Sequence, residues 1–162
     1  MSYGQTSSGK THTLFGNLST NELEWGLVPR TISHMFQEIS KSNTYRAATQ
    51  KVRLSLIEVY NEQIRDLLSS TTANLAVLQT SDGIHVQGLT TLHVTNTQEC
   101  LNRMKEGMGN RSTGSTAMNE QSSRSHCVVM LFVTDICSGK ESKLCLVVSD
   151  IYILLLCTNC GF

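Results

Sequence analysis

Eight consecutive residues near the N-terminus have the types and spacing of a loop that binds phosphate. They are Gly4, Gln5, Thr6, Ser7, Ser8, Gly9, Lys10 and Thr11, and they fit G-x-x-x-x-G-K-[ST] at every fixed position. The two glycines let the backbone curl so that successive N–H groups point at phosphate oxygens. Lys10 would place a cation beside the β- and γ-phosphates, and the Thr11 hydroxyl can coordinate Mg²⁺. The pattern predicts a nucleotide site, for which the confirming context is a strand before the loop and a helix after it.

A second polar cluster, MNEQSSRSH, occupies Met118 to His126. Its hydroxyls and Asn119 can order water around Mg²⁺ or a γ-phosphate, and Arg124 can stabilise developing charge or bind a carboxylate. Taken alone, the cluster is better explained as a solvated serine-rich loop before a strand. Together with the first loop, it becomes a candidate for the other half of a nucleotide site.

Apolar patterns between the two loops predict the elements that must position them. A helix is expected from Val28 to Ser40, because apolar residues recur at helical spacing and Pro29 suits a first helical turn. A buried strand is expected to begin at Val52, with a turn at Asn61. After that turn, the apolar residues suggest a short helical turn made by Ile64, Leu67 and Leu68.

Further along the chain, strands and helices continue to alternate. Short strand pieces broken by Gly88 come first, and a helix follows with Asn96 or Thr97 as its cap. Two strands over 127–136 and 142–148 are predicted to form a hairpin around Gly139. This alternation predicts an α/β domain whose central sheet carries helices on its faces.

Composition excludes several other classes of protein. The 162 residues are 40% hydrophobic and 16% charged, as in an ordinary globular domain and unlike a disordered chain. The formal net charge of zero gives no overall field toward nucleic acid, which is not expected as a partner. Six scattered cysteines and an N-terminus without an apolar run favour free thiols in a reducing, cytosolic compartment. Cys157 and Cys160 form a lone CxxC, which is a poor zinc signature.

The two loops together resemble those of the kinesin superfamily motor domain. YGQTSSGKTHTLFG resembles that family's phosphate loop, and NEQSSRSH resembles its first nucleotide-sensing switch. The stretches GLVPRTISHMF, LIEVYNEQIRDLL and GNRSTGSTAMNEQSSRSH resemble family segments in the same order. The resemblance extends from about Tyr3 to Val147, so that 1–147 is expected to be a partial kinesin motor domain and 148–162 an unmatched hydrophobic tail.

The resemblance implies a partial P-loop NTPase fold with a central mixed sheet flanked by helices. It implies ATP and Mg²⁺ as cofactors, microtubules (tubulin) as partner, ATP hydrolysis coupled to movement, and a cytoplasmic location on the microtubule cytoskeleton. Gly4 to Thr11 would hold the triphosphate, and His12 would either pack near the nucleotide or lie on a helix surface. The remaining roles are water positioning by Asn119, closure on the γ-phosphate by Ser122 and Ser123, metal contact by Thr11 and Ser123, and pairing of Arg124 with a glutamate of the second switch.

Three departures from the family pattern lead to further expectations. The family's strands before the phosphate loop have no counterpart, and neither does the microtubule-binding region beyond its second switch. Where the family has Asp-Leu-Ala-Gly-Ser-Glu, this chain continues VVSDIYILLLC, and Asp150 does not take the role of the missing carboxylates. The stretch 75–88 has no Lys or Arg, which weakens the electrostatic footprint for acidic tubulin. A retained intron near Val147 is one hypothesis for the departure.

Three functions therefore remain open: an ATP-binding motor fragment with impaired activity, a non-catalytic truncated product, and a regulatory decoy that binds a partner without hydrolysis. Whether the chain is an active ATPase is left undecided. A membrane anchor is disfavoured, because Ser149 and Asp150 interrupt an apolar run that is already too short to span a bilayer.

Overall fold

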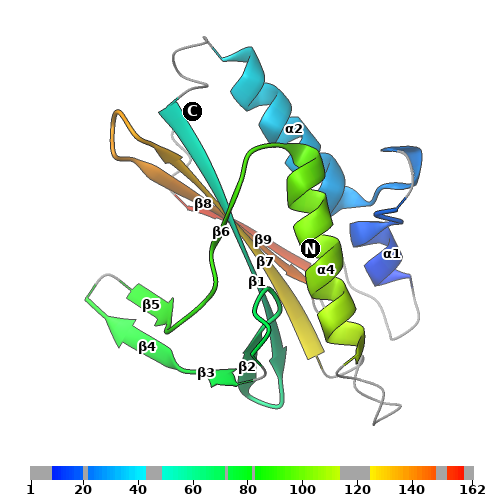
Figure 1. The fold of residues 1–162 in the computed structure, drawn as a ribbon, viewed down its shortest axis with the longest axis vertical. Coiled ribbons are helices and arrows are strands. Elements are labelled where there is room, and N and C mark those ends of the chain that lie inside the picture. The colour runs from blue at the N-terminus through cyan, green and yellow to red at the C-terminus, as the bar shows by residue number, and fades with distance from the viewer. Residues whose placement is uncertain are drawn as a thin grey trace.

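A computed structural model describes residues 9–19, 22–42, 49–71, 73–81, 83–113, 125–148 and 153–158 (Figure 1). Its helices are α1 (Lys10–Phe15), the 3₁₀ turn η1 (Glu22–Glu24), α2 (Leu27–Lys41) and α4 (Thr97–Thr113). Its strands are β1 (Gln50–Tyr60), β2 (Gln63–Asp66), β3 (Asn74–Leu75), β4 (Val77–Thr80), β5 (Gly83–Val86), β6 (Leu92–Val94), β7 (Ser125–Asp135), β8 (Glu141–Val148) and β9 (Ile153–Thr158).

Seven of these strands form one sheet in the order β3-β2-β1-β7-β8-β9, with β6 also pairing with β1. β7 follows one edge of β1 from Gln50↔Asp135 to Tyr60↔Ser125, while β2 and β6 share the other edge. The pairings among the described strands are antiparallel, and β4 and β5 form a separate hairpin. Figure 1 shows α1, α2 and α4 beside the long strands, so the predicted α/β fold, a sheet with packed helices, is confirmed.

The core lies between the helices and one face of β1 and β7. Side chains alternate across a strand, so every second residue of β1 and β7 points to the helical layer. That layer supplies the apolar face predicted for the helix over 28–40, which is α2 with one more residue at each end. The buried cluster contains Leu14, Phe15, Val28, Ile32, Val52, Leu54, Leu56, Leu67, Val94, Cys100, Leu101, Met104, Cys127, Val129 and Leu131.

The short helical turn predicted over Ile64 to Leu68 is wrong. The chain instead forms the β1–β2 hairpin, in which Ile64 pairs with Val59. Asn61 and Glu62 have φ values of 48° and 62°, the left-handed conformation of a two-residue hairpin turn whose twist matches the flanking strands. The apolar spacing imitated a helix because Ile64 on β2 and Leu67 and Leu68 just after the strand stand three and four residues apart, as on one face of a helix.

The other predicted elements are confirmed with small shifts. Strands β5 and β6 flank Gly88, which has a φ of 74°, and the β7–β8 hairpin turns at Gly139 with a φ of 66°. Strand β9 lies within the predicted tail and pairs with β8 from Val148↔Ile153 to Lys143↔Thr158. The domain boundary after Val147 stays a prediction. No helix in the described part of the chain has the length and apolarity needed to cross a membrane.

Candidate functional site

The last glycine of the predicted phosphate loop has the backbone conformation that such a loop needs. Gly9 precedes α1 with φ 83° and ψ 11°, a left-handed geometry that favours glycine. A Cβ at this position would meet nothing within 4 Å, so the conformation and not a lack of space calls for glycine. The Gly9 carbonyl accepts bonds from the Thr13 backbone N–H at 2.9 Å and the Thr13 hydroxyl at 3.1 Å.

Helix α1 is short, and tertiary packing holds it. Leu14 and Phe15 are buried in the core, whereas Thr11 and His12 are exposed on the other side of the helix. Gly26, which precedes α2, donates its N–H to the Phe15 carbonyl at 3.2 Å. A Cβ on Gly26 would lie 2.4 Å from the backbone C and O of Leu14, so only glycine permits this approach of α1 to the start of α2. Helix α1, which follows the predicted phosphate loop, is thus joined to the start of α2 through backbone contact.

Arg30 of α2 forms hydrogen bonds with the connection between α1 and α2. Arg30 donates Nε to the Trp25 carbonyl at 2.9 Å and Nη2 to the Leu23 carbonyl at 3.2 Å. Gly16 forms an antiparallel bridge with Trp25, and the Trp25 ring packs partly buried against the core. Both ends of the connection are therefore fixed relative to the phosphate-loop helix.

Helix α4 leads toward the second predicted loop and begins with a reciprocal cap, as expected at Asn96. Asn96 Oδ1 accepts the Glu99 N–H at 2.9 Å. Glu99 Oε2 accepts the backbone N–H and the hydroxyl of Thr95, each at 2.8 Å. These two bonds to Thr95 lower the pKa of the Glu99 carboxyl. The cap satisfies donors that helix geometry leaves unpaired.

The last turn of α4 meets the sheet through a buried ion pair. Arg111 Nε donates to Glu58 Oε1 of β1 at 3.3 Å, and the two side chains are 17% and 4% exposed. Arg111 Nη2 also donates to the Ser125 hydroxyl at 2.7 Å and to the Ser125 carbonyl at 3.3 Å, at the first residue of β7. The sequence reasoning missed this cluster, although a glutamate inside the apolar run LIEVY was an available signal.

Most of the sequence-predicted site residues fall outside the described residues. Of the phosphate loop, Gly9, Thr11 and His12 are placed and exposed, and the backbone of Lys10 begins α1. The exposed position of His12 fits either role predicted for it. The remaining predicted site residues lie outside the described part of the chain, so their positions and the distances between the two loops stay predictions. They are Gly4, Gln5, Thr6, Ser7, Ser8, Asn119, Ser122, Ser123 and Arg124.

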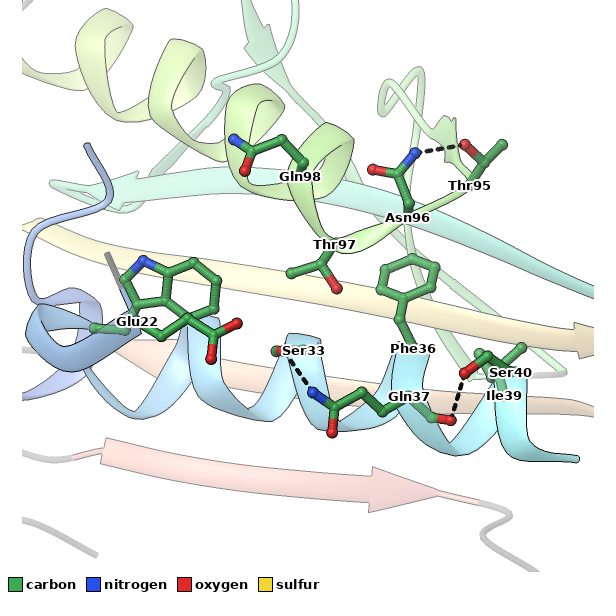
Figure 2. A pocket seen from close by; sticks show the side chains of 11 residues that line it. Glu22, Ser33, Phe36, Gln37, Ile39, Ser40, Thr95, Asn96, Thr97 and Gln98 are labelled. Atoms are coloured by element: carbon green, nitrogen blue, oxygen red, sulfur yellow. Dashed lines mark hydrogen bonds between the residues drawn. The ribbon is translucent and has the colours of Figure 1, made fainter. Parts of the chain in front are cut away.

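A hollow of about 620 Å³ opens beside α2 (Figure 2). Its walls come from α2, the residues before and within the first turn of α4, and η1 with Trp25. Gln37 Nε2 donates to Ser33 Oγ at 3.3 Å, and Asn96 Nδ2 donates to Thr95 Oγ1 at 3.2 Å along its rim. Gly9 and the residues of α1 are not among the described residues that line it.

Cys100 and Cys127 are buried cysteines with strongly shifted thiols. Burial raises the pKa of Cys100 and of Cys127 to about 12, so both thiols stay protonated and unreactive near neutral pH. Cys100, Cys127, Cys137 and Cys145 are free thiols, as predicted. Among the described residues, no three His, Cys, Asp or Glu side chains gather closely enough to hold a metal ion.

Comparison with known proteins agrees with the two-loop pattern. A sequence model described as the kinesin motor domain matches residues 1–154. The chain is 41% identical over 135 residues to kinesin-like protein KIN-12G of Oryza sativa subsp. japonica, covering 78% of this chain and 11% of that protein. It is 40% identical over 146 residues to kinesin-like protein 3 of Schizosaccharomyces pombe, covering 88% of this chain and 26% of that protein.

The fold also agrees with that of a solved kinesin structure. A solved structure described as a fast kinesin superposes with a TM-score of 0.76 at 34% identity, over 91% of this chain and 42% of that chain. The chain thus spans about a quarter or less of the two curated relatives and under half of the solved kinesin chain. Since the family model covers nearly the whole chain and the fold agrees with it, the chain belongs to the kinesin motor domain family.

Proposed function

We propose that this chain is the ATP-binding portion of a microtubule-based motor. The observation that carries the proposal is the left-handed Gly9 at the head of α1, inside a complete G-x-x-x-x-G-K-T sequence. That conformation turns the backbone at the point where a phosphate loop enters its helix. Open space at Gly9 and the exposure of Thr11 fit an incoming triphosphate and its metal ion.

The proposed roles of the side chains are those that the resemblance to the kinesin motor domain implies. Lys10 neutralises charge on the β- and γ-phosphates, and the hydroxyls of Thr11 and Ser123 hold Mg²⁺. Ser122 contacts the γ-phosphate, Asn119 orients the attacking water, and Arg124 offers a guanidinium to a carboxylate. Bound Mg²⁺–ATP supplies the phosphoryl group and the charge neutralisation that its transfer to water requires.

Turnover and microtubule affinity of this chain are proposed to be weak. The residues after Val147 run VSDIYILLLC where the family pattern has Asp-Leu-Ala-Gly-Ser-Glu, so Arg124 lacks the glutamate partner of that pattern. The β4–β5 hairpin exposes Val77 and Leu78, and 75–88 contains no Lys or Arg to attract acidic tubulin. A non-catalytic product, or a decoy that binds without hydrolysis, is the second candidate on the same observations. The proposed location of this chain is the cytoplasm, on the microtubule cytoskeleton.

Binding and turnover are tested separately on the purified chain. Fluorescent ATP is titrated with and without Mg²⁺, and phosphate release is followed with and without microtubules. Lys10→Ala is expected to abolish binding by removing the phosphate cation, while Lys105→Ala, an exposed lysine on α4, leaves it unchanged. An ATP affinity that is unchanged by Lys10→Ala and by the omission of Mg²⁺ would contradict the proposal. Robust microtubule-stimulated release would contradict the weak-turnover part, and binding without release would favour the decoy.

A further inference from the structure

The large sheet ends in a strand whose outer edge has no partner in the described part of the chain. Strand β9 pairs with β8 along one edge, from Val148↔Ile153 to Lys143↔Thr158, and stands last in the strand order β3-β2-β1-β7-β8-β9. In an antiparallel ladder, successive residues direct their backbone N–H and C=O groups alternately to one neighbouring strand and to the other. Half of the six residues of β9 therefore direct these groups to the open edge.

The other outlying strands are shorter or belong to a smaller sheet. β3 and β6, on the far side of β1 from β9, have two and three residues. β4 and β5 have four residues each and form a two-stranded hairpin, which is marginally stable by itself. β9 has six residues and continues a seven-stranded sheet. Among the described strands, it therefore offers the longest edge that a large sheet supports.

The sequence of β9 lacks the residues that usually protect an edge strand from pairing. Proteins place charged side chains, above all Lys, or Pro on such edges. The sequence ILLLCT contains no charged residue and no Pro, whereas the neighbouring strand β8 carries Glu141 and Lys143. Short apolar segments without charge, Pro or Gly pair readily with strands of other chains. The open edge of β9 is therefore suited to receive a further strand.

We propose that the open edge of β9 binds the same edge of a second copy of this chain, so that two sheets join into one continuous antiparallel sheet. A second copy supplies a strand of equal length, and a two-fold axis perpendicular to the sheet sets it antiparallel to the first. Because β9 carries no charge, this pairing brings no like charges opposite each other. It occupies the same edge on both chains, so the assembly closes at two copies.

Two-fold symmetry determines which residues of β9 meet. Opposed residues of an antiparallel pair lie on the same face of the sheet, and the axis preserves that face, so one residue must lie opposite its own copy. In a strand paired along most of its length, that residue is Leu155 or Leu156. Position 156 then lies directly opposite its copy or on the adjacent diagonal, within the range of cross-strand interactions. A charge introduced there would therefore meet the same charge from the second chain.

The first test uses the purified full chain without nucleotide, in a reducing buffer. One strand edge is a small interface, so association is expected to be reversible, and sedimentation should show the mass rising from one chain to two with concentration. At about fifty times the dissociation constant about one tenth of the chains remain single, so the outward amides of 153–158 should exchange about tenfold more slowly than in dilute solution. Exchange within α2 should not change. A chain that stays single at all concentrations, or that grows beyond two copies, overturns the proposal.

The second test places opposite charges on the edge. Leu156→Lys and Leu156→Glu should each raise the dissociation constant of the dimer by about tenfold through like-charge repulsion, and an equimolar mixture of the two should restore dimers. Val77→Lys adds the same charge to an exposed residue of the separate β4–β5 hairpin and should keep the wild-type constant. Dimers of wild-type affinity in either Leu156 variant, or no gain on mixing, overturn the proposal. If circular dichroism shows that a Leu156 variant does not fold, the exchange of the wild-type chain decides alone.

Discussion

The contact between Gly26 and the backbone of α1 gives a direct test of how the phosphate-loop helix is held. In a Gly26→Ala variant the new methyl carbon would lie 2.4 Å from the C and O of Leu14 and 2.6 Å from the carbonyl O of Thr13. Ordinary contact begins at 3.4 Å, so α1 and the start of α2 must separate by about 1 Å. The obstacle is backbone on both sides, which no side-chain rotation relieves.

The magnitude follows from three contributions. Overpacking of this kind costs about 1–3 kcal/mol, and the Gly26 N–H to Phe15 O bond adds about 1 kcal/mol when it breaks. Alanine restricts the unfolded chain and returns about 0.4–1 kcal/mol. The net expectation is a loss of about 2 kcal/mol in the free energy of unfolding, or a urea midpoint lowered by about 1 M.

Urea unfolding followed by far-ultraviolet circular dichroism measures this loss, and the fluorescence of Trp25, the sole tryptophan, reports on the adjacent contact. Gly109→Ala on α4 is the matched control, because a Cβ there meets nothing within 4 Å and its φ is unremarkable. That control should gain about 0.5–1 kcal/mol from helix propensity. A Gly26→Ala midpoint equal to or above that of the wild type would refute the steric argument.

Two further predictions concern titration. The bonds from Thr95 lower the pKa of Glu99 from 4.5, so the stability that its charged form adds is complete above pH about 4.5 and is lost as the pH falls through the lowered value. The midpoint difference between wild type and Glu99→Gln should therefore shrink in urea titrations carried from pH 6 toward pH 3, and a difference independent of pH would argue against the cap. With pKa values raised to about 12 by burial, Cys100 and Cys127 should resist iodoacetamide at pH 8 while exposed Cys137 is alkylated. Peptide mass spectrometry measures the rate of alkylation at each cysteine in native buffer and in urea. The prediction is wrong if Cys127 is labelled as fast as Cys137 in native buffer.

Much of the fold could be predicted because its signals are local. The apolar face over 28–40 has a helical period, Asn96 supplies a cap, and Gly139 marks a hairpin turn; all three predictions are confirmed. The helical turn expected after Asn61 failed because the left-handed pair Asn61-Glu62 decides the local structure, and its conformation is not evident from apolar spacing.

The role of the candidate site stays a prediction, and its structural supports were less predictable than its sequence pattern. The fixed positions of the phosphate loop are a local pattern, and Gly9 has the conformation that the pattern implies. The approach of Gly26 to Leu14 and the bond from Arg111 to Ser125 are tertiary contacts between separate elements. Neither leaves a periodic trace in the sequence, and an arginine in the last turn of a helix is equally explained by the helix dipole.

The long pairing of β1 with β7 has a consequence for the order in which the chain is made. Tyr60 pairs with Ser125, so everything from the β1–β2 hairpin through α4 must be synthesised before β1 acquires its second neighbour. Until then β1 has no partner on the edge that β7 will occupy. Its other edge is covered only by the short strands β2 and β6. Hairpins close fast and non-local pairs slowly, so the unpaired edge of β1 is most exposed to mispairing during this interval. Strands β8 and β9 can join only afterward, because β7 is the edge on which they build.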